Sequence, residues 1–193
     1  MKNLQNFTGE NMSNNYVCKV GKLELYVEGG DVTQTPSDAI MTAINSGGMW
    51  FGGIDGAIQR VAGNQYHAQA GMAELEDGNA IVATGDRNSH RGQFDNVIFV
   101  VDDLRKPLNE IVYAGLEAAH NSGYESIAMP TIRMGLMAGV VESTPQEAVQ
   151  RIGAGVETFM ATYATGTSLR KLSIVTFRDP SSNELLKRVL SRN

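Results

Sequence analysis

The sequence predicts an α/β fold arranged as a three-layer sandwich, in which a mixed and mostly parallel sheet carries helices on both faces. Strand signals and helix signals alternate along most of the chain, which is typical of a sheet covered on both faces. Residues 39–44 are almost continuously apolar, as in an interior strand that packs against helices on both sides. We expect one domain over residues 16–193, preceded by a flexible, asparagine-rich arm over residues 1–15.

The first half of the chain has a strand pair, the interior strand and one clear helix. Apolar and polar residues alternate around Gly21, which predicts two short strands with one solvated face. Apolar residues at helical spacing predict a helix over residues 54–62, which Gly63 can end. Residues 65–75 indicate a helical or irregular stretch. Further strands are expected at residues 80–84 and 96–101.

The second half repeats this alternation. Pro107 is expected to open a helix that ends before Gly123, and residues 126–129 predict a short buried strand. Thr144-Pro145-Gln146-Glu147 is a capping box with proline at the first helical position, so a long helix should run from there towards Tyr163. The last strand is expected at residues 172–177, and Asp179-Pro180 should start the final helix.

Composition excludes several function classes. A net charge of −5 argues against a broad surface for nucleic acid or anionic membranes, because either needs a basic stripe. The single cysteine, Cys18, permits neither an internal disulfide nor a cysteine-based zinc site, and His67, His90 and His120 lack metal-ligand spacing. No apolar stretch has membrane-spanning length and no signal peptide is visible, so a cytoplasmic location is expected.

Three short motifs near the start of the chain indicate a site for a nucleotide-sized ligand. Gly30-Asp31-Val32-Thr33 is a tight turn with an acid, Asn45 ends the apolar strand, and Gly52-Gly53-Ile54-Asp55 leads into a helix. Glycines let backbone amides approach phosphates, and carboxylates orient ribose or base. The order and spacing of these motifs therefore predict phosphate loops at the edge of a sheet.

These motifs resemble the macrodomain family, whose members bind ADP-ribose and in some branches hydrolyse bonds to its distal ribose. The family pattern reads approximately G-D-I-T, D-A-I-V-N-A-A-N and G-G-G-V-D-x-A-I-H, followed by a second phosphate loop. Pro130-Thr131-Ile132-Arg133-Met134-Gly135 stands where that second loop belongs. The resemblance implies a macrodomain-like fold and a ligand site comprising Asp31, Val32, Asn45, Gly52, Gly53, Ile54, Asp55, Arg133, Met134, Gly135, Leu136 and Met137.

Individual roles also follow from the resemblance, each beside a simpler alternative. Asp31 corresponds to the family aspartate that accepts a hydrogen bond from adenine, although an aspartate there is also a common turn cap. Asn45 is implied to hold the distal ribose, or else only braces its loop. Asp55 corresponds to the residue that positions or activates a water in hydrolytic members. A carboxylate near a helix N-terminus is also favourable for dipole reasons alone, by ~0.3–1 kcal/mol.

The second phosphate loop departs from the family pattern. Gly135 remains and lets a backbone amide approach a diphosphate, but the usual aromatic residue on the distal ribose is missing. Arg133 offers a charge-assisted phosphate contact, with an ion-paired or solvent-facing arginine as the alternative. Trp50 and Phe51 offer a replacement aromatic face or else form a hydrophobic plug.

The resulting prediction is a metal-independent hydrolase without a cofactor, acting on ADP-ribosyl esters or O-acetyl-ADP-ribose, with Asn45 and Asp55 as catalytic residues. Its partners would be ADP-ribose or ADP-ribosylated proteins and small molecules, with no membrane and no broad nucleic-acid binding. The alternatives are a module that binds ADP-ribose without turnover, a phosphatase acting on ADP-ribose phosphate, and an interaction domain with a degenerate pocket.

Overall fold

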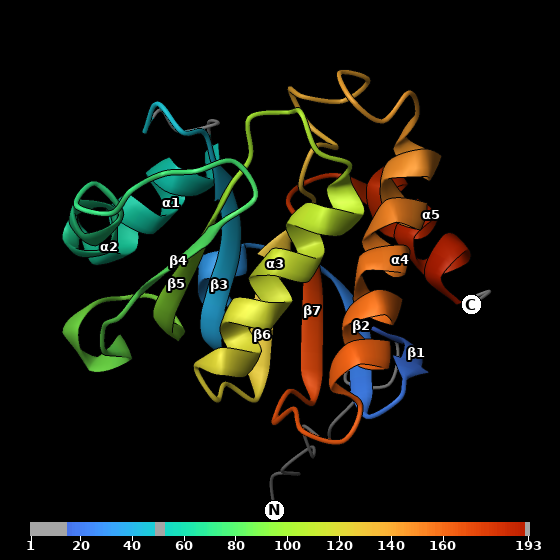
Figure 1. Cartoon of the computed structure of the whole chain (residues 1–193), viewed down its shortest axis with the longest axis horizontal. Helices are drawn as coiled ribbons and strands as arrows, with labels where there is room; N and C mark the ends of the chain where they lie inside the picture. Colours follow the sequence, from blue (N-terminus) through green and yellow to red (C-terminus); the bar gives the residue numbers. More distant parts are fainter. Residues whose placement is uncertain (1–14, 49–52, 192–193) are drawn as a thin grey trace, which may run out of the picture.

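The computed structural model describes residues 15–48 and 53–191, and within them seven strands form one mixed sheet (Figure 1). The strand order is β1-β2-β7-β6-β3-β5-β4. The strands are β1 (Tyr16–Val20), β2 (Leu23–Gly29), β3 (Ser37–Ile44), β4 (Ala80–Ala83), β5 (Phe94–Val101), β6 (Ser126–Pro130) and β7 (Lys171–Thr176). The two edge strands pair antiparallel with their neighbours, and the other pairs are parallel. The predicted mixed, mostly parallel sheet is confirmed.

Helices cover both faces of this sheet. They are α1 (Gly53–Ala62), α2 (Gln65–Ala70), α3 (Leu108–Asn121), α4 (Pro145–Tyr163) and α5 (Pro180–Leu190), with short 3₁₀ turns η1 (Val32–Gln34) and η2 (Arg87–Ser89). Buried residues of α3, α4 and α5 share one core cluster, and those of α1 and α2 share the other. The three layers are therefore two helical layers and the sheet between them (Figure 1).

Strand β3 is buried on both faces, as its apolar sequence predicts. Met41 belongs to the core on the α3 and α4 side, whereas Ile40 and Ile44 belong to the core on the α1 and α2 side. A Cβ atom on Gly115 of α3 would lie 1.9 Å from the Met41 sulfur. Glycine at position 115 therefore lets α3 approach the sheet closely.

The predicted helix ends agree with the structure. Thr144 Oγ1 accepts a hydrogen bond from the Glu147 amide at 3.1 Å, and Pro145 is the first residue of α4. Gly63 and Gly123 follow α1 and α3 with φ of 65° and 73°, in the left-handed region that glycine favours. The stretch expected over residues 65–75 is helical up to Ala70 and irregular beyond it, and β5 begins at residue 94 rather than 96.

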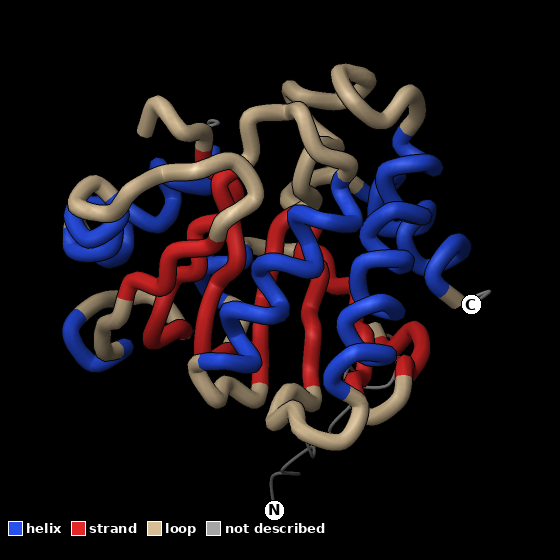
Figure 2. Tube along the Cα trace, viewed as in Figure 1, coloured by secondary structure: helices blue, strands red, loops and turns tan. Residues whose placement is uncertain are grey.

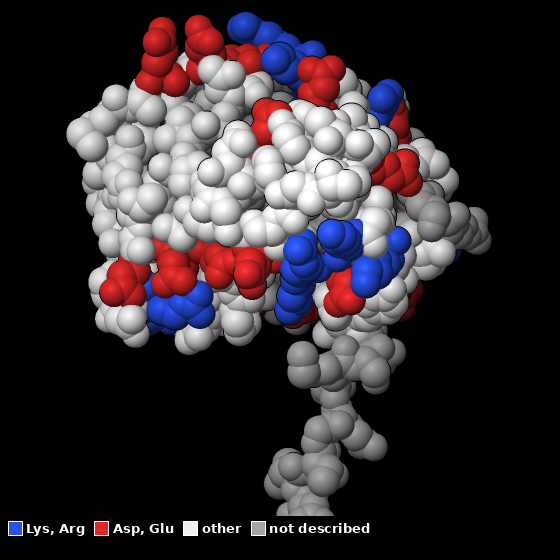
Figure 3. Space-filling view, turned by 60° about the horizontal axis from the view of Figure 1, so that its bottom comes forward, with Lys and Arg blue, Asp and Glu red and all other residues white. Residues whose placement is uncertain are grey.

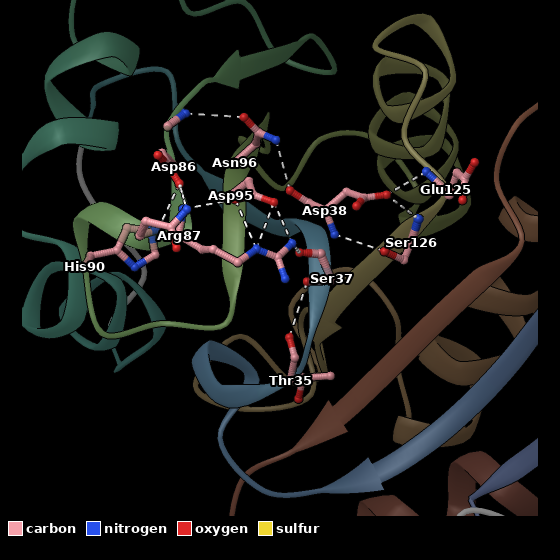
Figure 4. Close-up of polar contacts among 12 residues, drawn as sticks. Thr35, Ser37, Asp38, Asp86, Arg87, His90, Asp95, Asn96, Glu125 and Ser126 are labelled. Carbon is pink, nitrogen blue, oxygen red and sulfur yellow. Dashed lines mark hydrogen bonds and ion pairs between the residues drawn. The ribbon is translucent and has the colours of Figure 1, made fainter.

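A polar network fastens the amino ends of the parallel strands (Figure 4). Asp38 at the start of β3 accepts hydrogen bonds from the amides of Glu125 and Ser126 at 2.7 and 2.9 Å. Arg87 forms an ion pair with Asp95 at the start of β5. The Asp38 contacts join β3 to the start of β6, and the Arg87 pair joins η2 to β5, all at the edge opposite to the carboxyl ends of these strands.

The carboxyl ends of the parallel strands lie at the top in Figure 1, where the segments after β5 and β6 run side by side (Figure 2). On the face brought forward in Figure 3, basic side chains gather in a group beside acidic ones.

Within the described residues, no helix is long and apolar enough to cross a membrane. The arm predicted over residues 1–15 lies almost wholly outside the described residues, so the proposed domain division stays a prediction.

Candidate functional site

A cavity of about 480 Å³ opens at the carboxyl ends of the parallel strands. Its walls come from the β2–β3 connection, strand β3, helix α1, the segments after β5 and β6, and the end of β7. Ligand sites in open α/β sheets form at this edge. Eight of the residues predicted as ligand contacts line the cavity, namely Asp31, Val32, Gly53, Ile54, Arg133, Gly135, Leu136 and Met137.

Asp31 caps η1 and remains available to a ligand. Its Oδ1 accepts hydrogen bonds from the Thr33 amide at 2.9 Å and the Thr33 hydroxyl at 2.8 Å. Within the described residues no donor reaches Oδ2, and the residue is exposed on the cavity wall. Turn capping and ligand recognition are therefore compatible, because each uses a different oxygen. Val32 is 5% exposed and adds an apolar surface beside it.

Asn45 follows the last residue of β3 and is half-buried, but it does not belong to the cavity wall. Its carbonyl oxygen accepts a hydrogen bond from the Gly48 amide at 3.0 Å, which closes the turn after the strand. The expected glycine-rich loop continues beyond this turn. Trp50, Phe51 and Gly52 lie outside the described residues, so their predicted contacts stay predictions.

Asp55 is buried rather than exposed to the cavity. Its carboxylate is 3% exposed, and Oδ1 lies 3.4 Å from Nε2 of His67, which is 2% exposed. Among the described residues, Asp55 Oδ2 has no hydrogen-bond partner. Its proximity to His67 was not anticipated from the sequence, because the two residues lie on different helices. The catalytic role expected for Asp55 stays a prediction, and the cavity wall does not include it.

The guanidinium of Arg133 lies in a buried ionic cluster with Asp102 and Glu142. Its Nη1 donates to both Glu142 carboxylate oxygens at 3.0 Å. Its Nε and Nη2 donate to Asp102 at 2.9 and 2.6 Å, and Nη2 also donates to the Lys106 carbonyl at 2.8 Å. All three guanidinium nitrogens therefore donate to neighbouring groups of the protein. The ion-paired alternative therefore describes this side chain, and the phosphate contact expected of Arg133 stays a prediction.

This cluster places one guanidinium between two carboxylates and joins three segments. Burial lowers the pKa of Arg133, but the hydrogen bonds and charges of Asp102 and Glu142 outweigh it, so the pKa is raised above its ordinary value. Glu142 Oε1 also accepts a hydrogen bond from the Leu108 amide at 2.8 Å, at the N-terminus of α3. Arg133 has φ of 59°, so its backbone is left-handed at the turn that leads into the cavity.

Gly135, Leu136 and Met137, which follow Arg133 in the loop, line the cavity. In the described part of the chain, the amides of these three residues donate to no other group. Unpaired amides in consecutive loop residues are typical of anion-binding turns. Met134 was also predicted as a ligand contact, but it does not line the cavity and its side chain packs against the core of α3 and α4.

Phe177 and Arg60 are among the cavity residues that were not predicted as ligand contacts from the sequence. Phe177 follows β7 directly, is 64% exposed and lines the cavity in common with Asp31. Arg60 lies on the same face of α1 as Ile54 and Ala57, at the spacing of three residues that marks one side of a helix. That spacing was the available signal for Arg60. Among the described residues, no group of three or more His, Cys, Asp or Glu side chains could hold a metal ion.

Comparison with known proteins points to one family. A family model described as "Macro domain" matches residues 41–152, which is more than half of the chain. The chain is 31% identical over 124 residues to an O-acetyl-ADP-ribose deacetylase of Escherichia fergusonii, covering 60% of this chain and 70% of the relative. It is 24% identical over 200 residues to an ADP-ribose glycohydrolase of Archaeoglobus fulgidus, covering 92% and 97% respectively.

The fold is similar to that of solved macrodomains. The crystal structure of a Trypanosoma brucei macrodomain in complex with ADP-ribose superposes with a TM-score of 0.70. The sequence identity is 20%, and the match covers 85% of this chain and 68% of the other. At this identity the likeness concerns the fold, which agrees with the predicted three-layer arrangement.

Proposed function

Because the chain belongs to the macro domain family, we propose that it binds ADP-ribose or a close derivative and hydrolyses a bond at the distal ribose. The bond would be an ester, as in ADP-ribosyl esters or O-acetyl-ADP-ribose, the substrate class named for the Escherichia fergusonii relative. The natural substrate would be an ADP-ribosylated protein or small molecule in the cytoplasm. We assign no cofactor to this nucleotide-binding role.

The observation that carries the proposal is that different parts of the cavity wall suit different parts of the ligand. Its volume of about 480 Å³ falls within the range of small-molecule sites. Asp31 Oδ2 offers an acceptor for the exocyclic amine of adenine, and the exposed ring of Phe177 offers a surface on which a base can stack. These two side chains line the same cavity and fit the purine end of the ligand.

Backbone amides fit the diphosphate. Gly135, Leu136 and Met137 contribute one group of amides, and the N-terminus of α1 at Gly53 contributes another. Both kinds of group bind anions without a full positive charge, because helix N-termini and loop amides carry partial positive charges. If the diphosphate lies between these two groups of amides, the distal ribose would lie on the side of Asn45 and the start of α1.

Calorimetry tests the binding part of this proposal. ADP-ribose is expected to bind with a dissociation constant in the micromolar range, about −8 kcal/mol, and adenosine more weakly because it lacks the diphosphate. Product analysis with ester-linked, acetylated and phosphorylated ADP-ribose tests turnover. Release of the acyl group supports the hydrolase, release of inorganic phosphate supports the phosphatase alternative, and absence of ADP-ribose binding contradicts the proposal.

The burial of Asp55 favours a second candidate, a module that binds ADP-ribose without turnover. A carboxylate that activates water must reach the reacting group, and the Asp55 carboxylate is 3% exposed beside His67. Binding with no product from any ester-linked substrate would support this candidate over the hydrolase.

A further inference from the structure

The cavity has two cationic side chains among its described residues, and they differ in what they can still bind. Arg133 donates from all three guanidinium nitrogens to Asp102, Glu142 and the Lys106 carbonyl, and its side chain is 2% exposed. Arg60 is exposed, and no carboxylate of the described residues lies within ion-pair distance of it. The charge that can meet an anionic ligand in this cavity therefore belongs to Arg60.

The side chain of Arg60 runs back along α1 towards the N-terminus of the helix. Its Nη1 lies 3.4 Å from the position that a Cβ atom on Gly56 would occupy. Helical side chains lean in this direction, so this conformation is relaxed. Gly56 is three residues after Gly53, or about 4.5 Å along the helix axis. The guanidinium therefore lies within roughly one turn of the amides at the start of α1.

A cation in the last turn of a helix also has a simpler role, since it stabilises the C-terminal end of the helix dipole. That role would direct the guanidinium of Arg60 towards the final carbonyls. Here the group lies over Gly56 instead, and another residue contacts those carbonyls. Arg91 Nη2 donates to the Arg60 carbonyl at 2.8 Å, and the Arg91 amide donates to the Val61 carbonyl at 3.1 Å.

We propose that Arg60 binds a phosphoryl oxygen of the ligand diphosphate, between the amides at the start of α1 and those of Gly135–Met137. The proposal rests on the proposed function and adds to it a specificity-determining side chain. A guanidinium forms strong, charge-assisted hydrogen bonds with phosphate, whereas the two sets of amides carry only partial charges. In a chain of net charge −5, this cation also favours the approach of an anionic ligand.

Calorimetry with the Arg60→Gln variant tests the proposal, using adenosine, ADP and ADP-ribose as ligands. Glutamine has nearly the helix propensity of arginine, so α1 should persist. ADP and ADP-ribose should bind about tenfold more weakly to the variant, and adenosine should bind equally well, because only the first two have a diphosphate. Arg60→Lys should recover part of the loss, since lysine keeps the charge but not the planar pair of donors.

Arg151→Gln is the matched control. It removes the same charge from an exposed arginine of α4 that lies outside the cavity, and it should leave all three affinities unchanged. Unchanged ADP-ribose affinity in Arg60→Gln, or an equal loss for adenosine, would overturn the role of Arg60. A lack of ADP-ribose binding by the wild type would instead contradict the proposed function, so the two failures are distinguishable.

Discussion

Arg133 and Glu142 lie nine residues apart on the two sides of the loop that lines the cavity, and both Glu142 oxygens accept from Arg133 Nη1 at 3.0 Å. This contact closes the loop at its base. Asp102 after β5 and the Leu108 amide of α3 join the same cluster. The loop backbone is thereby held by side chains that lie beneath it, and the amides of Gly135–Met137 remain available to a ligand.

Replacing Arg133 should be costly to folding. In Arg133→Met, the carboxylates of Asp102 and Glu142 would remain buried without their counterion, and both are at most 4% exposed. Removing one partner of a buried ion pair costs about 3–5 kcal/mol. We expect a loss of this size in the free energy of unfolding, measured by urea denaturation followed by circular dichroism.

Arg151→Met provides the comparison for that measurement. Arg151 pairs with Glu147 at 3.8 Å on the surface of α4, with side chains 46% and 37% exposed. Surface pairs of this kind contribute about 0–1 kcal/mol. Equal losses of stability in the two variants would show that the buried cluster is not a special element of the fold.

Asp31→Asn should change ligand preference while keeping the turn. Asparagine keeps an oxygen for the Thr33 amide and hydroxyl, so the cap of η1 persists. It replaces Oδ2 with an amino group, which cannot accept a hydrogen bond from the amine of adenine. ADP-ribose is therefore expected to bind at least tenfold more weakly, as measured by calorimetry.

Inosine diphosphate is the informative second ligand, because its base has a carbonyl oxygen where adenine has the amine. The wild type should prefer ADP to inosine diphosphate, and Asp31→Asn should lose or reverse that preference. An unchanged preference would remove Asp31 from the base-recognition site.

Local signals in the sequence predicted the elements and their ends well. The capping box at Thr144 and the glycines after α1 and α3 depend only on neighbouring residues. The helix ends they form can therefore be predicted from the sequence. The apolar β3 segment likewise implied burial on both faces. Two stretches of 3₁₀ turn were not predicted, because single-turn helices have too few residues for a periodic pattern.

The site was predicted less completely because its geometry depends on long-range contacts. Arg133 was assigned to phosphate by its place in the loop, but Asp102 lies 31 residues away in sequence and reaches it only in the folded chain. His67 of α2 likewise approaches Asp55 of α1 only when the two helices pack together in the folded chain. Phe177 directly follows β7, and the parallel pairing of β7 with β2 brings it to the cavity that Asp31 also lines.

Asp179 should make stability depend on pH in the acidic range. Hydrogen bonds from the Ser181 and Ser182 side chains lower its pKa to about 2. The unfolded-state pKa is about 3.9, so the stabilising contribution is complete above that value and is lost as the pH falls towards 2. Since Asp179 is partly exposed, we expect this contribution to be at most about 1 kcal/mol.

Asp179→Asn isolates the effect, because asparagine also caps helices but does not titrate. Urea midpoints at pH 7, 4 and 2.5 should fall less steeply for the variant than for the wild type below pH 4. Parallel curves for the two proteins would contradict the role assigned to the Asp179 carboxylate at the start of α5.

Asp55→Asn separates the hydrolase from the binding module. Asparagine keeps an oxygen near His67 Nε2, which lies 3.4 Å from Asp55 Oδ1, so the packing of α1 on α2 should persist. If the Asp55 carboxylate positions or activates a water, it acts mainly in the transition state. The single-turnover rate on an ester-linked ADP-ribosyl substrate should then fall by ~10²–10⁴-fold, while ADP-ribose affinity changes little.

His67→Gln tests whether such a loss comes from the carboxylate or from the buried pair. This variant keeps the Asp55 carboxylate and alters its neighbour, so a purely structural pair predicts parallel losses of stability and affinity in both variants. A water-activating Asp55 predicts instead that Asp55→Asn lowers the rate far more than His67→Gln does. Undiminished turnover in Asp55→Asn would exclude Asp55 from the chemistry, because no other effect of the substitution could replace a missing general base.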